Sequence, residues 1–321
     1  MRILVTGGSG FIGSHLCERL IEIGHTVTAI DDFSTGRAAN LVSLQGNDSF
    51  TLIEGSILDT HTLGPLIKDA DYVFHLAAAV GVFNIVNNPL ASLLTNIRGT
   101  ENVLEAAYAT KTPVFLTSSS EVYGKNVSDS LKEGDDRILG SPITLRWSYS
   151  EAKAIDESLA YAYFIEKHLE TRIVRFFNTV GPRQLGTYGM VVPRFIKSAL
   201  ANEPITIYGD GNQTRCFAHV YDVIDAVIAI AFAANTVGKV INIGNNYEIS
   251  INDLAEKIIS ETHSQSNIVH LPYEEAYGDG FEDMERRVPN IDLINQLVSW
   301  KPKRELKEMI EDISAEMKKS S

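Results

Sequence analysis

The sequence predicts an α/β fold in which a doubly wound parallel sheet is joined by a smaller C-terminal part. Short apolar runs rich in β-forming residues alternate with segments of helical periodicity through the first half of the chain. A glycine-rich turn follows the first of these runs. The 321 residues suffice for one large domain or for a large and a small one.

The first unit of the chain reads as a strand, a turn and a helix. Residues 2–6 form a strand-like apolar run, and Phe11 to Ile23 carries apolar residues at helical spacing. The glycines of residues 7–13, between the two, have the spacing of a turn at which a pyrophosphate meets the N-terminus of a helix. This unit therefore predicts a dinucleotide site.

The second strand is predicted from Thr26 to Ile30 and ends in Asp31 and Asp32. These acids follow the glycine turn by about 20 residues, which is where the adenosine ribose hydroxyls lie in such sites. A carboxylate accepts hydrogen bonds from two hydroxyls and repels a 2′-phosphate. Asp31 therefore predicts NAD rather than NADP.

The remaining strands and helices continue the alternation. Strands are predicted at Phe50–Glu54, Tyr72–Leu76, Val114–Ser118 and Thr171–Phe176. Helices are predicted at Pro89–Ala109 and Tyr149–His168. Together with the first two strands, these segments predict one parallel sheet with helices on its faces.

The character of the chain changes after Phe177, where loop-like segments flank an amphipathic helix predicted at Val191–Ala201. We assign residues 1–177 to a cofactor-binding domain and expect the chain to return to it around residues 214–245. Residues 178–321 are assigned mainly to a smaller, substrate-binding part. A substrate is expected between the two, at the carboxyl ends of the strands.

The predicted chemistry lies at the end of the fifth strand and on the following helix. Tyr149 precedes Lys153 by one helical turn, so both side chains lie on one face. The ammonium is expected to lower the pKa of the phenol from about 10 and to hold the nicotinamide ribose. The phenolate is then a base, and Ser119 at the strand end is expected to share the substrate hydroxyl.

Composition and charge exclude several classes of protein. The net charge of −13 disfavours nucleic acid as a partner. The two cysteines, Cys17 and Cys216, provide neither a disulfide framework nor metal-ligand spacing, so no metal is predicted. The chain opens with a strand rather than a signal peptide, and its longest apolar stretch, Ala226 to Ala234, is too short to cross a bilayer. These features predict a cytoplasmic protein without a membrane partner.

These motifs resemble one family, the extended short-chain dehydrogenase/reductases that act on nucleotide sugars. Its members include epimerases, dehydratases and decarboxylases. The resemblance covers nearly the whole chain and rests on residues 6–13, 31–36, 75–78, 96–100, 119–124, 175–183 and 209–215. It implies a Rossmann-type fold, bound NAD, a UDP-sugar substrate and a homodimer built from the helices that begin near Pro89 and Tyr149.

The resemblance also implies the binding residues. Those for NAD are Gly7, Gly10, Phe11, Ile12, Gly13, Asp31, Asp32, Ser34, Thr35, Gly36, Ser56, Ile57, Leu76, Ala77, Ala78, Asn96, Thr117, Tyr149 and Lys153. Those for the nucleotide sugar are Asn178, Arg183, Val192, Arg194, Tyr208, Arg215 and one of two late arginines, Arg286 or preferably Arg287. Ser56 departs from the family, which more often has Asp beside the adenine.

The triplet Ser119-Ser120-Glu121 discriminates among the activities. Dehydratases that resemble this chain place an acid where Ser120 stands, and simple 4-epimerases usually carry a small or neutral residue where Glu121 stands. UDP-glucuronate decarboxylases resemble the chain in this triplet and in residues 146–150 and 215–217. Decarboxylation of UDP-glucuronate is therefore predicted, with Tyr149 and Lys153 joining the triplet in catalysis.

Glu121 and Ser120 are expected to position the sugar carboxylate or to reprotonate carbon 5. Three other interpretations stay open at this stage. Glu121 can be a structural carboxylate at a strand end, in which case a UDP-sugar 4-epimerase is the alternative function. An NAD-binding regulator typically lacks the Tyr149/Lys153 pair. An ordinary alcohol dehydrogenase would not need the series Asn178, Arg183 and Arg215.

Overall fold

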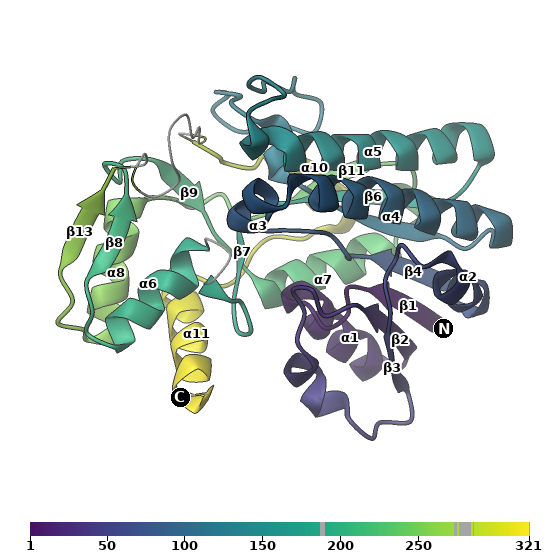
Figure 1. The fold of residues 1–321 in the computed structure, drawn as a ribbon, viewed down its shortest axis with the longest axis horizontal. Coiled ribbons are helices and arrows are strands. Elements are labelled where there is room, and N and C mark those ends of the chain that lie inside the picture. The colour runs from purple at the N-terminus through teal and green to yellow at the C-terminus, as the bar shows by residue number, and fades with distance from the viewer. Residues whose placement is uncertain (187–189, 273–274, 276–283, 285, 321) are drawn as a thin grey trace.

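The computed structural model describes residues 1–186, 190–272, 275, 284 and 286–320 (Figure 1). Its centre is a seven-stranded sheet in which every neighbouring pair is parallel, in the order β11-β6-β5-β4-β1-β2-β3. The strands are β1 (Arg2–Thr6), β2 (Thr26–Asp31), β3 (Phe50–Glu54), β4 (Tyr72–His75), β5 (Val114–Ser119), β6 (Thr171–Phe176) and β11 (Val240–Ile243). The α/β fold class predicted from the sequence is confirmed.

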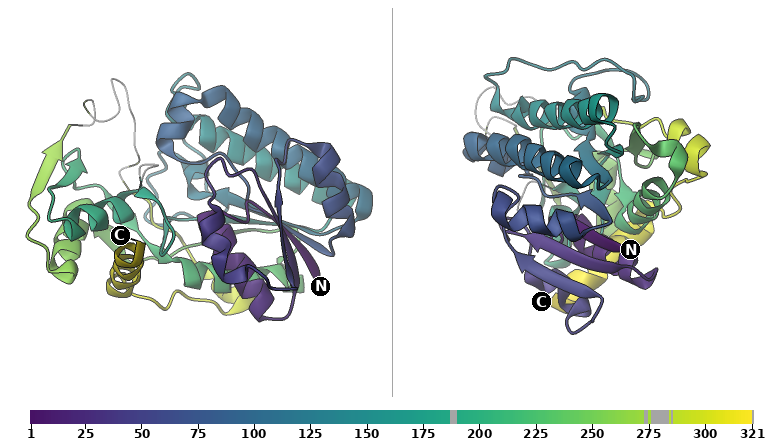
Figure 2. Two further views of the ribbon diagram at one scale, coloured as in Figure 1. Left: turned by 60° about the horizontal axis from the view of Figure 1, so that its bottom comes forward. Right: turned by 90° about the vertical axis from the view of Figure 1, so that its right-hand side faces the viewer.

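Helices cover both faces of the sheet (Figure 2). On one face lie α2 (Thr60–Asp69), α4 (Pro89–Thr110) and α5 (Ser148–Lys167), which share a core with the strands. On the other lie α1 (Phe11–Glu22), α7 (Val220–Ala231) and α10 (Asp292–Val298). Short helices connect these layers, namely η1 (Ala38–Leu44), α3 (Val82–Asn87), η2 (Ser120–Tyr123), η3 (Leu145–Trp147) and η5 (Ala234–Thr236).

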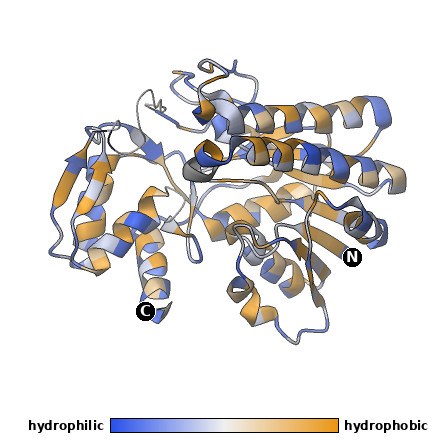
Figure 3. Cartoon of the chain, viewed as in Figure 1, coloured by the Kyte–Doolittle hydropathy of each residue, from blue (hydrophilic) through white to orange (hydrophobic). Residues whose placement is uncertain are grey.

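Apart from the edge strand β3, which has no buried residue, the strands are buried on both faces because side chains alternate in direction along each of them. In β1, Ile3 and Val5 belong to the core on the α1 side, whereas Leu4 between them belongs to the core on the α4 side. Such strands read as continuous apolar runs, which is why six of the seven could be predicted with ends within two residues. Figure 3 shows this hydrophobic centre between helices of mixed character.

The second part of the molecule has its own core. Helices α6 (Val191–Leu200), α8 (Ile251–Thr262) and α11 (Leu306–Ser320) pack on one another around residues such as Phe195, Leu254 and Ile313. Three two-stranded ladders complete this part. They are β7 (Thr179–Val180) with β10 (Ala218–His219), β8 (Ile205–Tyr208) with β13 (Ile268–Leu271), and β9 (Thr214–Cys216) with β12 (Glu248–Ser250).

The chain crosses between the two parts more than once. After building β8 and β9 in the second part, it returns through α7 and adds β11 to the sheet beside β6. It then leaves again for β12 and α8. Within the part of the chain that the structure describes, no helix combines the length and the apolar character that a bilayer span requires.

Candidate active site

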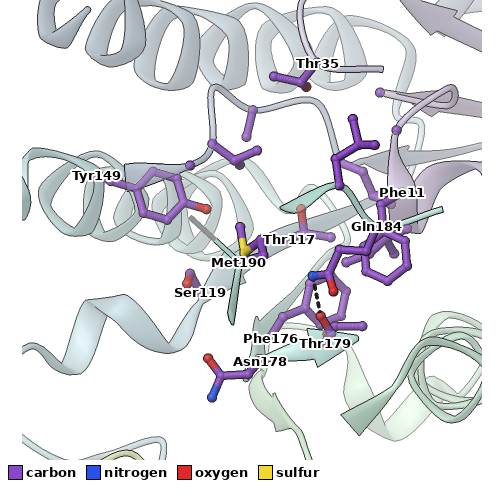
Figure 4. Close-up of a pocket in the computed structure, with 18 of the residues that line it drawn as sticks. Phe11, Thr35, Thr117, Ser119, Tyr149, Phe176, Asn178, Thr179, Gln184 and Met190 are labelled. Atoms are coloured by element: carbon purple, nitrogen blue, oxygen red, sulfur yellow. Dashed lines mark hydrogen bonds between the residues drawn. The ribbon is translucent and has the colours of Figure 1, made fainter. Parts of the chain in front are cut away.

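A cavity of about 490 Å³ opens at the carboxyl ends of the strands, between the sheet and the second part. Nearly every residue predicted to bind or react lines it, and Figure 4 shows Tyr149, Ser119 and Thr117 around this space. The exceptions are Gly36, Ser56 and Asn96, together with Arg286 of the two late arginines, none of which is among the lining residues. The motifs read from distant parts of the sequence therefore converge on one place.

The first three exceptions shape the wall instead. Asn96 accepts a hydrogen bond from the Ala79 amide at 2.7 Å and donates to its carbonyl at 3.2 Å, which fixes the loop after β4. A Cβ at Gly36 would lie 2.7 Å from a carboxylate oxygen of Asp31. Ser56 accepts a hydrogen bond from the amide of Leu58 at 3.3 Å.

The glycine turn leaves room for a pyrophosphate. Gly7 has a φ of +72°, and a Cβ at Gly13 would lie 2.1 Å from the Gly7 carbonyl oxygen, so a side chain at Gly13 would push α1 off the turn. Helix α1 begins after Gly10 without a side-chain cap, which leaves the amides of its first turn for an anion. The residues present thus fit NAD.

Asp31, at the end of β2, lines the same cavity as the glycine turn and is held in place by backbone amides. Its carboxylate accepts hydrogen bonds from the amides of Ser9 and Phe33, both at 2.9 Å, and only 7% of the residue is exposed. Asp32 beside it is exposed. A carboxylate fixed in this place leaves no room for a 2′-phosphate, which accounts for NAD rather than NADP.

Tyr149 and Lys153 line the cavity from α5. The Lys153 ammonium donates to the Thr117 carbonyl at 3.0 Å and to Asp156 at 3.2 Å. The expected lowering of the Tyr149 pKa is wrong for this structure: burial raises that pKa, Glu121 and Asp156 raise it further, and a hydrogen bond with Ser119 opposes them. Burial of the phenol is the main cause, and the nearby charges of Glu121 and Asp156 add to it.

Glu121 lies between two guanidinium groups. Arg146 and Arg287 each approach one of its carboxylate oxygens at 2.6 Å. Burial alone would raise the pKa of Glu121, but the two arginines outweigh it and lower the pKa to about 2. Glu121 is therefore a fixed carboxylate with no proton to donate, so the expected reprotonation of carbon 5 by this residue is wrong, whereas a positioning role fits.

Of the two late arginines, Arg287 lines the cavity and Arg286 does not. Arg286 forms a bidentate pair with Glu248, with both distances 2.7 Å, and does not line the cavity. Arg287 lines the cavity and donates its other terminal nitrogen to Asn178 at 2.6 Å. Asn178 in turn donates to the Cys216 carbonyl at 2.9 Å, which ties Arg287 to the end of the sheet.

The other predicted cations are anchored around the cavity. Arg183 forms an ion pair with Glu18 at 2.7 Å. Because Glu18 is on α1, this pair lies on the cofactor side of the cavity. Arg194 donates to the Thr206 carbonyl at 2.7 Å and stacks on Tyr208, 4.3 Å from the ring centroid. Arg215 donates to the Thr214 carbonyl at 2.8 Å. In a chain of net charge −13, this gathering of arginines indicates a polyanionic ligand.

A family model described as the NAD dependent epimerase/dehydratase family matches residues 3–244. The chain belongs to this family. It is an enzyme, and NAD is its cofactor.

The names of individual relatives describe more specific activities than the family name does. A protein of Bacillus cytotoxicus named UDP-N-acetyl-alpha-D-glucosaminuronate decarboxylase is 42% identical over 302 residues, covering 94% of this chain and 92% of the relative. UDP-glucuronic acid decarboxylase 1 of Danio rerio is 36% identical, over 94% of this chain and 69% of the relative.

Among solved structures, a UDP-glucuronic acid 4-epimerase from Bacillus cereus, in complex with UDP-glucuronic acid and NAD, superposes with a TM-score of 0.90 at 32% identity and full coverage of both chains. The resemblance predicted from the motifs is thereby confirmed. Decarboxylases and epimerases of this family share the scaffold, so the choice between them depends on the site itself.

Arg146 and Asp156 are among the polar residues that sequence reasoning missed. Arg146 lines the cavity and entered the prediction only within the family segment 146–150, and Asp156 sits one turn beyond Lys153. The signal for Asp156 was its spacing of three residues from the lysine on a helix. Arg146 carried a weaker signal, because its partner Glu121 lies on a different element.

Proposed function

We propose that this enzyme decarboxylates a UDP-hexuronate through a 4-keto intermediate. The observation that carries the proposal is the Glu121 carboxylate held by Arg146 and Arg287 beside Ser119. An epimerase moves a hydride and a proton and has no need of this charged group. The names of the two similar decarboxylases support the same assignment and share a uronate as substrate.

Each residue has a role in this reaction. Tyr149 takes the proton of the 4-hydroxyl, with Ser119 sharing the hydrogen bond and Lys153 holding the nearby ribose. NAD, when bound, accepts the hydride of carbon 4 and returns it at the end of the turnover. The ketone is β to the carboxylate, so the electrons of the breaking carbon–carbon bond flow into the ketone oxygen, where Tyr149 and Ser119 stabilise the enolate.

Arg146 and Arg287 supply the positive charge for the anionic sugar. Because Glu121 already neutralises part of that charge, the carboxylate of the substrate is oriented without being held too tightly to leave. Carbon 5 then takes a proton from a water molecule, because Glu121 with its pKa of about 2 carries none to give. Arg194, Arg215 and Asn178 are assigned to the nucleotide and the diphosphate.

The test is incubation with UDP-glucuronate and, separately, UDP-N-acetylglucosaminuronate, each labelled with carbon-13 at carbon 6, in the presence of NAD. Labelled carbon dioxide from either substrate supports the proposal and identifies the substituent at carbon 2. A UDP-galacturonate product that retains the label would make the chain a 4-epimerase, which is the second candidate because of its likeness to the Bacillus cereus epimerase.

Changing Asp31 to Ser is expected to weaken the preference for NAD over NADP by tenfold or more, on the order of 1.4 kcal/mol, because the charge that opposes a 2′-phosphate is removed. Binding of both cofactors is measured by quenching of protein fluorescence. Asp48→Ser is the matched control, since this aspartate is exposed and does not line the cavity. An unmodified protein that binds NADP as tightly as NAD would contradict the assignment.

We also propose a homodimer in the cytoplasm. On α5, Ile155, Tyr161 and Ile165 are 41%, 47% and 51% exposed, and Leu90 of α4 is 69% exposed. Packing this face on a second copy would remove these side chains from water. Both cysteines are buried and free, which suits a reducing compartment. A measurement of molar mass in solution tests the dimer.

A further inference from the structure

A fully buried carboxylate stands behind the catalytic lysine. Asp156 lies one turn beyond Lys153 on α5, is 0% exposed, and accepts a hydrogen bond from the Lys153 ammonium at 3.2 Å. The same ammonium donates to the Thr117 carbonyl of β5 at 3.0 Å. Asp156 is not part of the cavity wall, so it cannot touch a ligand directly.

Neutral groups surround Asp156 on its other sides. The Thr100 hydroxyl of α4 favours the charged form of Asp156, and it lies 3.1 Å from Nε2 of His75 on β4. Burial lowers the pKa of His75 to about 3, so this ring is neutral. Nδ1 of His75 forms a hydrogen bond with the Thr6 hydroxyl at 2.8 Å. The oxygen of that hydroxyl also accepts a hydrogen bond from the Ala77 amide.

Glu157, the next residue on α5, is paired with a different cation. Glu157 forms a bidentate pair with Arg175 of β6, at 2.8 and 2.7 Å, and accepts from the Ser118 hydroxyl at 2.5 Å. Burial raises the pKa of Asp156, the Lys153 ammonium opposes this rise, and the charge of Glu157 adds a smaller increase. The ionised state of Asp156 therefore depends on Lys153.

We propose that Asp156 is a positioning residue of the proton-transfer pair, which holds the Lys153 ammonium against the Thr117 carbonyl and weakens the positive field of that ammonium at the Tyr149 hydroxyl. The proposal rests on the proposed role of Tyr149 as the base. It makes the basicity of Tyr149 depend on a residue that touches neither substrate nor cofactor. Glu121 acts on Tyr149 in the same direction from the cavity side.

The direction of the effect follows from the charges. The negative charge of Asp156 raises the pKa of Tyr149, so Asp156→Asn should lower that pKa. Asn keeps an acceptor for Lys153 and removes the charge. The acid limb of kcat/KM should move to lower pH by about one unit, which is about a tenfold gain on the steep part of the limb.

The experiment compares pH profiles of kcat/KM for the unmodified enzyme and Asp156→Asn, saturated with NAD. Asp222→Asn on α7 is the matched control, because Asp222 is also buried and pairs with Arg304 at 2.5 Å, far from Tyr149. The control is expected to lower the melting temperature and leave the acid limb in place. A purely structural Asp156 would behave like the control.

A second readout needs no substrate. Optical titration of the phenolate in the NAD-loaded enzyme, taken as a difference against Tyr149→Phe, should show the same shift in Asp156→Asn, even if the proposed substrate is not turned over. Failure of the proposed function is thus distinguished from failure of this inference. If Asp156→Asn does not fold, Thr100→Val should shift the titration in the same direction, because the Thr100 hydroxyl favours the charged form of Asp156. Unshifted curves in folded variants overturn the proposal.

Discussion

Replacing Tyr149 with Phe is expected to reduce turnover by a factor of about 10² or more, because the variant lacks the hydroxyl that takes the proton from the 4-hydroxyl of the sugar. The phenyl ring still fills its place in the cavity wall, so NAD should bind with nearly unchanged affinity. Stopped-flow absorbance of the reduced nicotinamide measures the first hydride transfer directly, and calorimetry measures binding.

Tyr72→Phe provides the matched control for this substitution. Tyr72 is buried in the core, and its hydroxyl donates to the Ala231 carbonyl at 3.2 Å, far from the cavity. Its loss should cost about 1 kcal/mol of stability and leave turnover intact. If Tyr149→Phe kept more than about a tenth of the unmodified rate, another group would have to be the base.

Replacing Glu121 with Ala is expected to reduce release of carbon dioxide by about 10², while the initial oxidation falls by about tenfold or less. Without the carboxylate, Arg146 and Arg287 lose their common partner and are free to clamp the carboxylate of the substrate. Quantifying labelled carbon dioxide against transient formation of reduced nicotinamide separates the two steps. Equal losses in both would contradict the assigned role.

Glu248→Ala is the control for Glu121→Ala, since Glu248 makes a similar pair with Arg286 outside the cavity. Stability should also respond differently. Removing one partner of a buried pair costs about 3–5 kcal/mol, whereas an exposed pair contributes about 1 kcal/mol or less. Because the pKa of Glu121 falls from 4.5 to about 2 on folding, its stabilising contribution is present above about pH 4.5 and is lost as the pH falls toward 2.

The cofactor half of the site could be predicted from the sequence because its signals are local. A glycine turn after a strand, and an acid at the end of the next strand, are read within about 30 residues. The parallel sheet then brings strand ends such as Thr6, Asp31 and Ser119 to one edge. Local pattern and topology together suffice for this part.

The charge pairings of the substrate half could not be predicted in the same way. Arg287 meets Glu121 across 166 residues of sequence, and its neighbour Arg286 turns to Glu248 instead. Which of two adjacent arginines faces the cavity depends on the backbone of a segment without a periodic pattern. The raised pKa of Tyr149 was also missed, because the sequence shows neither the burial of its phenol nor the closeness of Glu121 and Asp156.

The return of the chain to the sheet sets a condition on how this protein is made. A nascent chain that has emerged only as far as α5 and β6 exposes the edge of β6, whose partner β11 is encoded some 65 residues later, at Val240–Ile243. An unpaired edge of this kind is a template for association with other chains. Folding on the ribosome therefore has to wait for most of the chain, and a pause in translation between β6 and β11 would favour aggregation over the native sheet.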